Sequence, residues 1–173
     1  MPYLLDKSPI EFRKRRLLFI DLEMSGLDVS THEILEIAAL LVPQPDFEVI
    51  NSYYAKIKPL HIETADPKAM KKNSYDPKVW SDAITLRQAL QELSQMAPDC
   101  LLAGWAVQNE WDFLNAALAR EDLPYFYHHH LIEVSTLAFV HLYPDSDVKF
   151  LNLNRVCQKL GIYLDHHKPD SDI

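Results

Sequence analysis

The stretch LLFIDLE at residues 17–23 decides how this chain folds. Its leading apolar residues predict a buried central strand, in which residues two positions apart point to the same face. Asp21 and Glu23 then stand side by side at the end of that strand. Adjacent carboxylates repel each other unless a cation lies between them, and Mg2+ or Mn2+ prefers oxygen ligands of this kind. The stretch therefore predicts either a divalent-metal site or a strand end whose two acids are solvated.

The length and composition of the chain fit one domain. Its 173 residues are 48% hydrophobic, which is enough for a sizeable core. We expect a single domain over residues 1–173, with residues 1–15 as an N-terminal extension. The apolar stretches are short and interrupted by charge, so neither a membrane-spanning helix nor a membrane partner is expected. Cys100 and Cys157 lie far apart, which favours a reduced, cytoplasmic protein.

The charge and the glycine content exclude several classes of function. The net charge is −8 at pH 7, whereas a protein that grips long stretches of duplex carries a basic face. Binding of a few nucleotides at a strand end through metal ions remains compatible with this charge. With only three glycines, the chain contains no glycine-rich phosphate loop, dinucleotide fingerprint or nucleophile elbow.

Alternating strand and helix patterns predict an α/β layer fold. Strands are expected over residues 17–22, 34–42, 49–57 and 100–105, the first three as an antiparallel meander. Helices are expected over residues 66–72, 85–96, 110–120, 134–142 and 151–160.

A second acidic centre is expected at the start of the helix over residues 110–120. Glu110 shares a helical face with the apolar residues Phe113 and Leu114, whereas Asp112 is rotated by about 200° from Glu110. Glu110 should therefore point toward the first strand, and Asp112 should point to solvent. Asp112 remains the alternative third acid, because helix starts are predicted only to within a few residues.

Two histidine-containing segments are further candidates. Near the C-terminus, His167 is followed five residues later by Asp172, which together can supply a proton acceptor and a metal ligand. His166 and Asp170 compete with them for these roles, and a polar tail of this kind is more often a solvated loop. The three histidines at residues 128–130 are another candidate metal cluster. Consecutive histidines are not expected to point at one ion, so we interpret this run as a loop or an interface.

In combination, these motifs resemble those of the DEDDh family of 3′–5′ exonucleases. The shared order is an Asp-x-Glu pair on the first strand, an acid opening a helix after a glycine-ended strand, and a His with an Asp five residues later. The stretch FIDLEMSGLD at residues 19–28 is similar to the first motif of oligoribonuclease. The stretch IETADPKAMKKNSYDPKVW at residues 62–80 looks more like ribonuclease T and the proofreading subunit of DNA polymerase III.

The resemblance implies a ribonuclease H-like fold, in which an antiparallel meander is followed by parallel strands and helices flank the mixed sheet. It also implies a metal-dependent enzyme that removes 5′-mononucleotides from the 3′ end of single-stranded DNA or RNA, or of short oligonucleotides. Several relatives are dimers, which makes a homodimer plausible.

The resemblance also implies roles for individual residues. Two divalent ions, Mg2+ or Mn2+, would lie at the acidic centre. His167 would accept the proton of the attacking water. The implied metal ligands are Asp21, Glu23, Glu110 and Asp172. The segment implied to approach the terminal nucleotide consists of Met24, Ser25, Gly26 and Leu27.

Two features depart from the family pattern. The family usually has Gly-His-Asn-x-x-Phe-Asp-x-x-Phe-Leu around its third acid, and GWAVQNEWDFL at residues 104–114 aligns without a gap only if Glu110 replaces the Asp. The extra methylene group moves the carboxylate by about one C–C bond, and such a displacement can cost ~100-fold in rate. The family also continues a helix beyond its final Asp, so we expect the helix after residue 172 to be missing. These departures motivate an alternative, a catalytically weakened module that binds nucleic acid or a protein partner.

Overall fold

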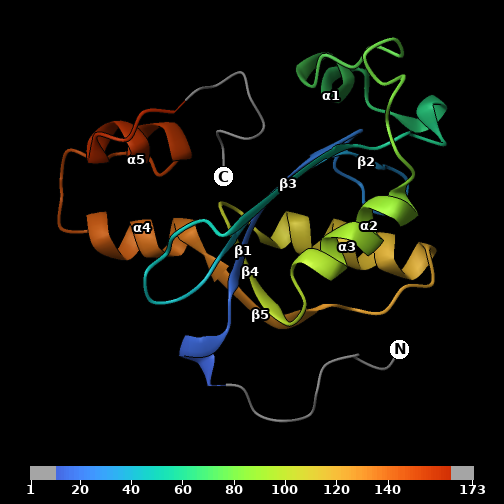
Figure 1. Cartoon of the computed structure of the whole chain (residues 1–173). Coiled ribbons are helices and arrows are strands. Elements are labelled where there is room, and N and C mark those ends of the chain that lie inside the picture. The colour runs from blue at the N-terminus through green and yellow to red at the C-terminus, as the bar shows by residue number, and fades with distance from the viewer. Residues whose placement is uncertain (1–10, 165–173) are drawn as a thin grey trace.

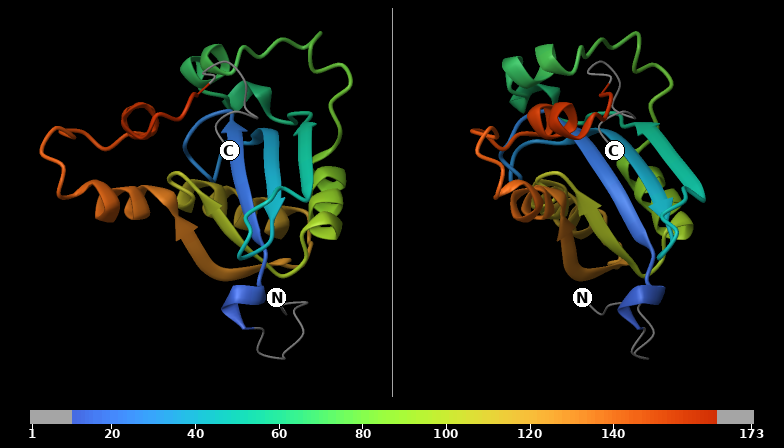
Figure 2. Two further views of the ribbon diagram at one scale, coloured as in Figure 1. Left: turned by 60° about the vertical axis from the view of Figure 1, so that its left-hand side comes forward. Right: turned by 90° about the vertical axis from the view of Figure 1, so that its left-hand side faces the viewer.

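The computed structural model describes residues 11–164 and centres on a five-stranded sheet with the order β3-β2-β1-β4-β5 (Figures 1 and 2). The strands are β1 (Leu17–Met24), β2 (Ile34–Val42), β3 (Asn51–Lys56), β4 (Cys100–Gly104) and β5 (Tyr127–Glu133). β1 pairs antiparallel with β2, and β2 antiparallel with β3. β4 runs parallel to both β1 and β5. The predicted mixed sheet, a meander followed by parallel strands, is confirmed.

Five α-helices and two short 3-10 turns connect the strands within residues 11–164. They are η1 (Phe12–Lys14), η2 (Ile62–Thr64), α1 (Pro67–Lys72), α2 (Leu86–Met96), α3 (Gln108–Arg120), α4 (Val134–Leu142) and α5 (Leu153–Leu160). Side-chain caps fix the starts of α1, α2, α4 and α5; at α1 the Asp66 carboxylate accepts from Lys68 N at 2.7 Å, and at α2 the Thr85 hydroxyl accepts from Gln88 N at 3.2 Å. α5 ends at Gly161, which adopts the left-handed conformation with φ 70°.

The main core lies between the sheet and the helices α2 and α3. Leu18, Ile20 and Leu22 of β1 are buried and pack in one cluster with Leu90 of α2 and Leu114 of α3. Because side chains alternate along a strand, the residues between them on β1 point to the opposite face. Burial of Leu18, Ile20 and Leu22 therefore fixes Asp21 and Glu23 together on the other face of the central strand.

The end of β4 lies close against β1 at Gly104. A Cβ atom at this position would lie 3.0 Å from the carbonyl oxygen of Ile20, closer than side-chain carbons normally approach a backbone atom. Glycine therefore allows the chain to leave β4 beside the acidic end of β1 and to enter α3 directly. This connection brings the start of α3 to the first two acids.

The interpretation of residues 128–130 as a loop is wrong, because they form part of the edge strand β5. Cys100 of β4 pairs with Tyr127 and Leu102 with Leu131, so β5 contains two more residues than β4 across this interval. Such a bulge interrupts the alternation of side chains by which a strand is predicted. The other predicted strands and helices are present, with ends that differ from prediction by three residues or fewer.

Candidate active site

Three carboxylates meet on one face of the sheet at the acidic end of β1. Asp21 and Glu23 are both partly buried, and Glu36 of β2 lies directly opposite Glu23 in the antiparallel register. Glu36 is only 6% exposed, and the hydroxyl of Tyr54 donates a 2.5 Å hydrogen bond to its Oε2. Like charges opposite each other across a strand pair are unfavourable. The site therefore concentrates negative charge beyond the predicted Asp21–Glu23 pair.

Sequence reasoning did not include Glu36 in the site. A signal was available, because Glu36 is the one charged residue in the apolar stretch ILEIAALLV at residues 34–42. A lone acid in a buried strand needs a polar partner or a function. Its position opposite Glu23 depends on the register between β1 and β2, which the sequence alone does not specify.

The predicted third acid of the site, Glu110, lies in the first turn of α3. Glu110 is 6% exposed and lies on the same buried face as Phe113 and Leu114. Asp112 is exposed, and its Oδ1 accepts from the side-chain amide of Gln108 at 2.9 Å. The orientations predicted from helical periodicity are therefore confirmed: Glu110 faces the core side of the helix, and Asp112 faces solvent.

The electrostatic surroundings of Glu110 are unusual for a carboxylate. Burial, together with the nearby charges of Asp21, Glu133 and Glu23, raises the pKa of Glu110 to about 8. The buried Oε2 atom of Glu110 has no hydrogen-bond partner among the described residues. A buried carboxylate oxygen without a partner, close to two further carboxylates, matches the oxygen ligands that Mg2+ and Mn2+ prefer. The described acids thus fit a divalent-metal centre.

This raised pKa makes the stability of the metal-free protein depend on pH. Below about pH 4.5 Glu110 is protonated in both folded and unfolded chains, whereas between that value and about 8 only the folded chain keeps the proton. The folded state then binds more protons, so the free energy of unfolding falls as pH rises from about 4.5 to about 8, by up to a few kcal/mol, and levels off above that pH. We expect the melting temperature in EDTA to drop between about pH 5 and about pH 8.

The matched control for this pH dependence is Glu110→Gln, which cannot ionise and should show a flatter melting profile over the same range. Mn2+ should restore the melting temperature of the parent chain at high pH, because it binds the ionised carboxylate. Equal pH profiles for the parent and the variant in EDTA would contradict the raised pKa.

Glu133 holds the turn that leads into α3. Its carboxylate accepts from the backbone N–H groups of Ala106 at 2.9 Å and Val107 at 3.0 Å. It also accepts from Ser135 N at 2.9 Å and so caps α4. One side chain at the end of β5 therefore fixes the start of α3, two to four residues before Glu110. Sequence analysis did not identify this residue, because its capping position is visible only once β5 is recognised.

The predicted substrate-binding segment follows β1 and is firmly held. The Asn73 side-chain amide donates to Met24 O at 2.9 Å, and the buried Ser25 hydroxyl accepts from Glu33 N at 2.9 Å. A Cβ atom on Gly26 would lie 2.4 Å from the ring of His32, so this ring occupies the space above the glycine. Leu27, by contrast, is 85% exposed. The segment therefore presents one apolar side chain on a fixed backbone.

A lysine from α1 reaches the acidic centre. Lys72 Nζ lies 3.5 Å from Glu23 Oε2, and the lysine side chain is 77% exposed. α1 lies beside the substrate-binding segment, since Asp66 N donates to Ser25 O at 2.8 Å just before the helix begins. The arrangement puts a mobile positive charge at the edge of the carboxylate cluster.

The remaining predicted site residues, His167 and Asp172, lie outside the described residues, as do the alternatives His166 and Asp170. Their roles remain predictions.

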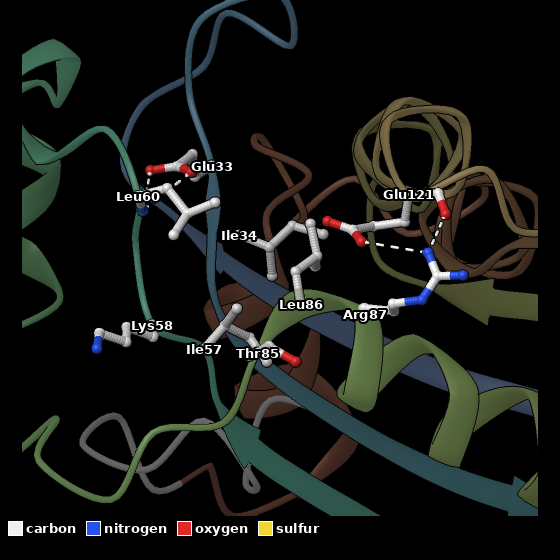
Figure 3. A pocket seen from close by; sticks show the side chains of 9 residues that line it. All are labelled: Glu33, Ile34, Ile57, Lys58, Leu60, Thr85, Leu86, Arg87 and Glu121. Carbon is white, nitrogen blue, oxygen red and sulfur yellow. Dashed lines mark hydrogen bonds and ion pairs between the residues drawn. The ribbon is translucent and has the colours of Figure 1, made fainter.

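A pocket of about 320 Å³ lies elsewhere, between the start of β2 and the start of α2 (Figure 3). Ile34, Ile57 and Leu86 give it an apolar wall, and the ion pair of Arg87 with Glu121 lies at one side. None of the predicted site residues within 11–164 lines this pocket, so it is separate from the described acidic centre.

A mixed sheet with carboxylates gathered at the end of its central strand is typical of one class of protein, the nucleases. A sequence model described as "Exonuclease" matches residues 18–173. This chain belongs to that exonuclease family.

The relatives of this chain include an oligoribonuclease and a ribonuclease T. The chain is 30% identical over 151 residues to the human mitochondrial oligoribonuclease, an alignment that covers 73% of this chain and 57% of that protein. It is 25% identical over 186 residues to ribonuclease T of Shewanella denitrificans, covering 99% of this chain and 80% of that protein. The chain thus spans somewhat more than half of the length of the oligoribonuclease.

Solved structures support the ribonuclease H-like fold. Escherichia coli exonuclease I in complex with a dT13 oligonucleotide superposes with a TM-score of 0.75 at 16% identity, covering 92% of this chain and 39% of that one. An exonuclease I from Methylocaldum szegediense gives the same TM-score at 16% identity, over 92% of this chain and 38% of that one. Among residues 11–164, no helix has the length and apolar character needed to cross a membrane.

Proposed function

We propose that this chain is a metal-dependent 3′–5′ exonuclease that removes 5′-mononucleotides from single-stranded DNA or RNA, or from short oligonucleotides. The observation that carries the proposal is the buried Glu110 carboxylate, which lies near Asp21 and Glu23 and has one oxygen without a partner in the part of the chain that the structure describes. Membership of the exonuclease family supports the same reaction. Without a compensating cation this cluster is an unfavourable arrangement, so its presence favours a metal-binding role.

Two divalent ions, Mg2+ or Mn2+, would supply an activated water and stabilise the leaving 3′-oxygen. Asp21, Glu23 and Glu110 are the described residues that would hold them, and Asp172 is the fourth proposed ligand. Glu110 must lose its proton for this, so its raised pKa links metal binding to proton release. His167 is proposed to accept the proton of the attacking water, a task suited to its unperturbed pKa of about 6.5.

A single-stranded substrate fits the surroundings of the cluster. Leu27 is exposed and follows the acids closely in the chain, so its side chain can pack against the terminal base. The backbone just before it is fixed by the hydrogen bond from Asn73 to Met24 O. The exonuclease I structure contains a dT13 oligonucleotide, and the human relative is named an oligoribonuclease. Both names favour single strands or short oligonucleotides over duplexes as substrates of this chain.

Lys72 is expected to contact a substrate phosphate once metal ions neutralise Glu23. Lys72→Ala should raise KM for an oligonucleotide by about two- to fivefold and change kcat by less than about twofold, because one exposed ionic contact is worth up to ~1 kcal/mol. Steady-state kinetics at low and high salt measure this effect, which should shrink at high salt. Lys71→Ala, on the same helix, is the matched control. Equal effects of the two substitutions would contradict a specific role for Lys72.

The test of the proposed function is direct. Purified protein is incubated with an oligonucleotide labelled at its 3′ end and Mn2+, and the products are resolved against a nucleoside 5′-monophosphate standard. Release of labelled 5′-mononucleotide that EDTA abolishes is expected. No metal-dependent release of mononucleotide from DNA or RNA would overturn the proposal.

The substitution of Asp by Glu at position 110 favours one alternative, a weakened exonuclease fold that binds nucleic acid or a protein partner. Glu110→Asp distinguishes the two, because it keeps the charge and shortens the side chain by one methylene group. For an active enzyme adapted to glutamate we expect turnover to fall, by up to ~100-fold. A gain of tenfold or more would instead support the weakened form.

Two further expectations belong to this proposal. A cytoplasmic, reduced setting is consistent with Cys100 and Cys157, which are both buried and form no disulfide within residues 11–164. A homodimer, which the family resemblance implies, is also proposed, and analytical ultracentrifugation tests it.

A further inference from the structure

The edge strand β5 carries a cluster of titratable side chains that the proposed exonuclease reaction does not use. One possible ligand atom from each of His128, His129 and His130 lies within 4.8 Å of the other two. The ring centroids of His128 and His129 are 4.1 Å apart, and those of His129 and His130 are 4.2 Å apart. Three imidazoles therefore gather on one side of a strand, where regular alternation would separate neighbours.

The bulge in β5 explains this gathering. Between the pairs Cys100–Tyr127 and Leu102–Leu131, two extra residues of β5 have no place in regular pairing with β4. A local hydrogen bond from His130 N to His128 Nδ1, at 3.2 Å, folds the segment on itself. The sequence pattern led us to expect that consecutive rings would not point at one ion, whereas the three ligand atoms lie within 4.8 Å of one another.

We propose that His128, His129 and His130 form a binding site for a transition-metal dication of the zinc class, separate from the acidic centre. Neutral imidazole nitrogen is a preferred ligand of Zn2+, Ni2+ and Cu2+, whereas Mg2+ prefers oxygen. Three histidines leave a fourth tetrahedral position for water, as in open zinc sites.

The geometry requires only small movements. Zn–N bonds of about 2.0–2.1 Å place tetrahedral ligand atoms about 3.4 Å apart, so nitrogens now within 4.8 Å must close by at most about 1.4 Å. His129 and His130 are exposed and can rotate freely enough to do this. Binding would also replace the His130–His128 hydrogen bond or move a proton between the nitrogens of His128. At 3.2 Å that bond is long, so its loss is small beside three metal–nitrogen bonds.

One positive charge, on Arg15, lies near the cluster, and the carboxylate of Asp99 offsets it in part. Arg15 acts on His128, but its guanidinium forms an ion pair with the carboxylate of Asp99. Burial, with smaller contributions from Arg15 and the other two rings, lowers the pKa of His128. A neutral ring keeps a nitrogen lone pair for the metal.

A metal ion at this site would stabilise an exposed edge of the sheet. β5 has a neighbour on one side only among the described strands, and its last residue, Glu133, holds the start of α3. A metal ion bridging three rings would stiffen the bulge in the middle of this strand. We therefore expect zinc to raise the thermal stability of the protein without being part of the hydrolytic reaction.

The experiment measures zinc binding to the whole chain by equilibrium dialysis, with Mg2+ in excess to occupy the acidic centre. One zinc per chain is expected, with a rise in melting temperature. His129→Ala and His130→Ala should each weaken zinc binding by at least about tenfold. His61→Ala and His141→Ala, two exposed histidines in other segments, are the matched controls and should bind as the parent does. Circular dichroism checks that all variants are folded.

Two further arms separate this site from other zinc ligands. In Asp21→Asn protein, zinc binding should persist, so the result does not depend on the proposed exonuclease function. In His166→Ala protein it should also persist, which excludes a site carried by the C-terminal segment. Zinc binding that His129→Ala and His130→Ala leave unchanged, or that Mg2+ displaces, would overturn the proposal.

Discussion

Asp21→Asn is expected to lower exonuclease turnover by about 10³- to 10⁴-fold, the largest effect of any single substitution in the described site. The change keeps the size of the side chain and removes one negative charge from the metal-binding cluster. Because the same charge also opposes ionisation of Glu110, its loss should leave the metal-free fold at least as stable as the parent. Single-turnover kinetics with Mn2+ measure the rate, and thermal melting in EDTA measures the stability.

Asp147→Asn is the matched control, because Asp147 is an exposed acid between α4 and α5 and should keep parental turnover. A large loss of activity together with a large loss of stability would point to misfolding of the Asp21 variant. Parental turnover in a stable Asp21→Asn protein would contradict the metal centre itself.

Glu110→Gln is expected to reduce turnover by about 10²- to 10³-fold, whereas Asp112→Asn should stay within about twofold of the parent. Glu110 is buried beside the other acids, and Asp112 is exposed and bonded to Gln108. The two substitutions each neutralise one carboxylate in the same helical turn, so each serves as the control of the other. Titration of activity with Mn2+ should show weaker metal activation for Glu110→Gln.

The reverse pattern, with turnover lost only in Asp112→Asn, would show that the third acid was assigned to the wrong residue. Loss in both variants with normal melting would mean that both carboxylates serve the reaction.

The parts of the fold that could be predicted are those for which neighbouring residues carry the signal, either as a periodic apolar pattern or as a helix cap. The apolar stretches at residues 17–22 and 34–42 predicted β1 and β2, and the cap at Asp66 predicted α1. The orientation of Glu110 followed from the 3.6-residue period of a helix. These predictions rest on local geometry, which the sequence specifies directly.

The features that escaped prediction depend on how separate strands pair. Glu36 joins the acidic face only through the register of β2 against β1, and the three histidines gather only through a bulge against β4. Glu133 is the last residue of β5, and its carboxylate accepts hydrogen bonds from a turn 26 to 27 residues earlier in the chain. Contacts of this range are set by tertiary packing, and local residue patterns do not encode them.

The Glu133 carboxylate makes two distant stretches of the chain, residues 106–107 and 133–135, a single mechanical unit. Anyone grafting the third acid of this centre onto another scaffold would need to transplant both stretches together. A graft of α3 alone would contain Glu110 but would lack the hydrogen bonds from Glu133 that fix the start of the helix.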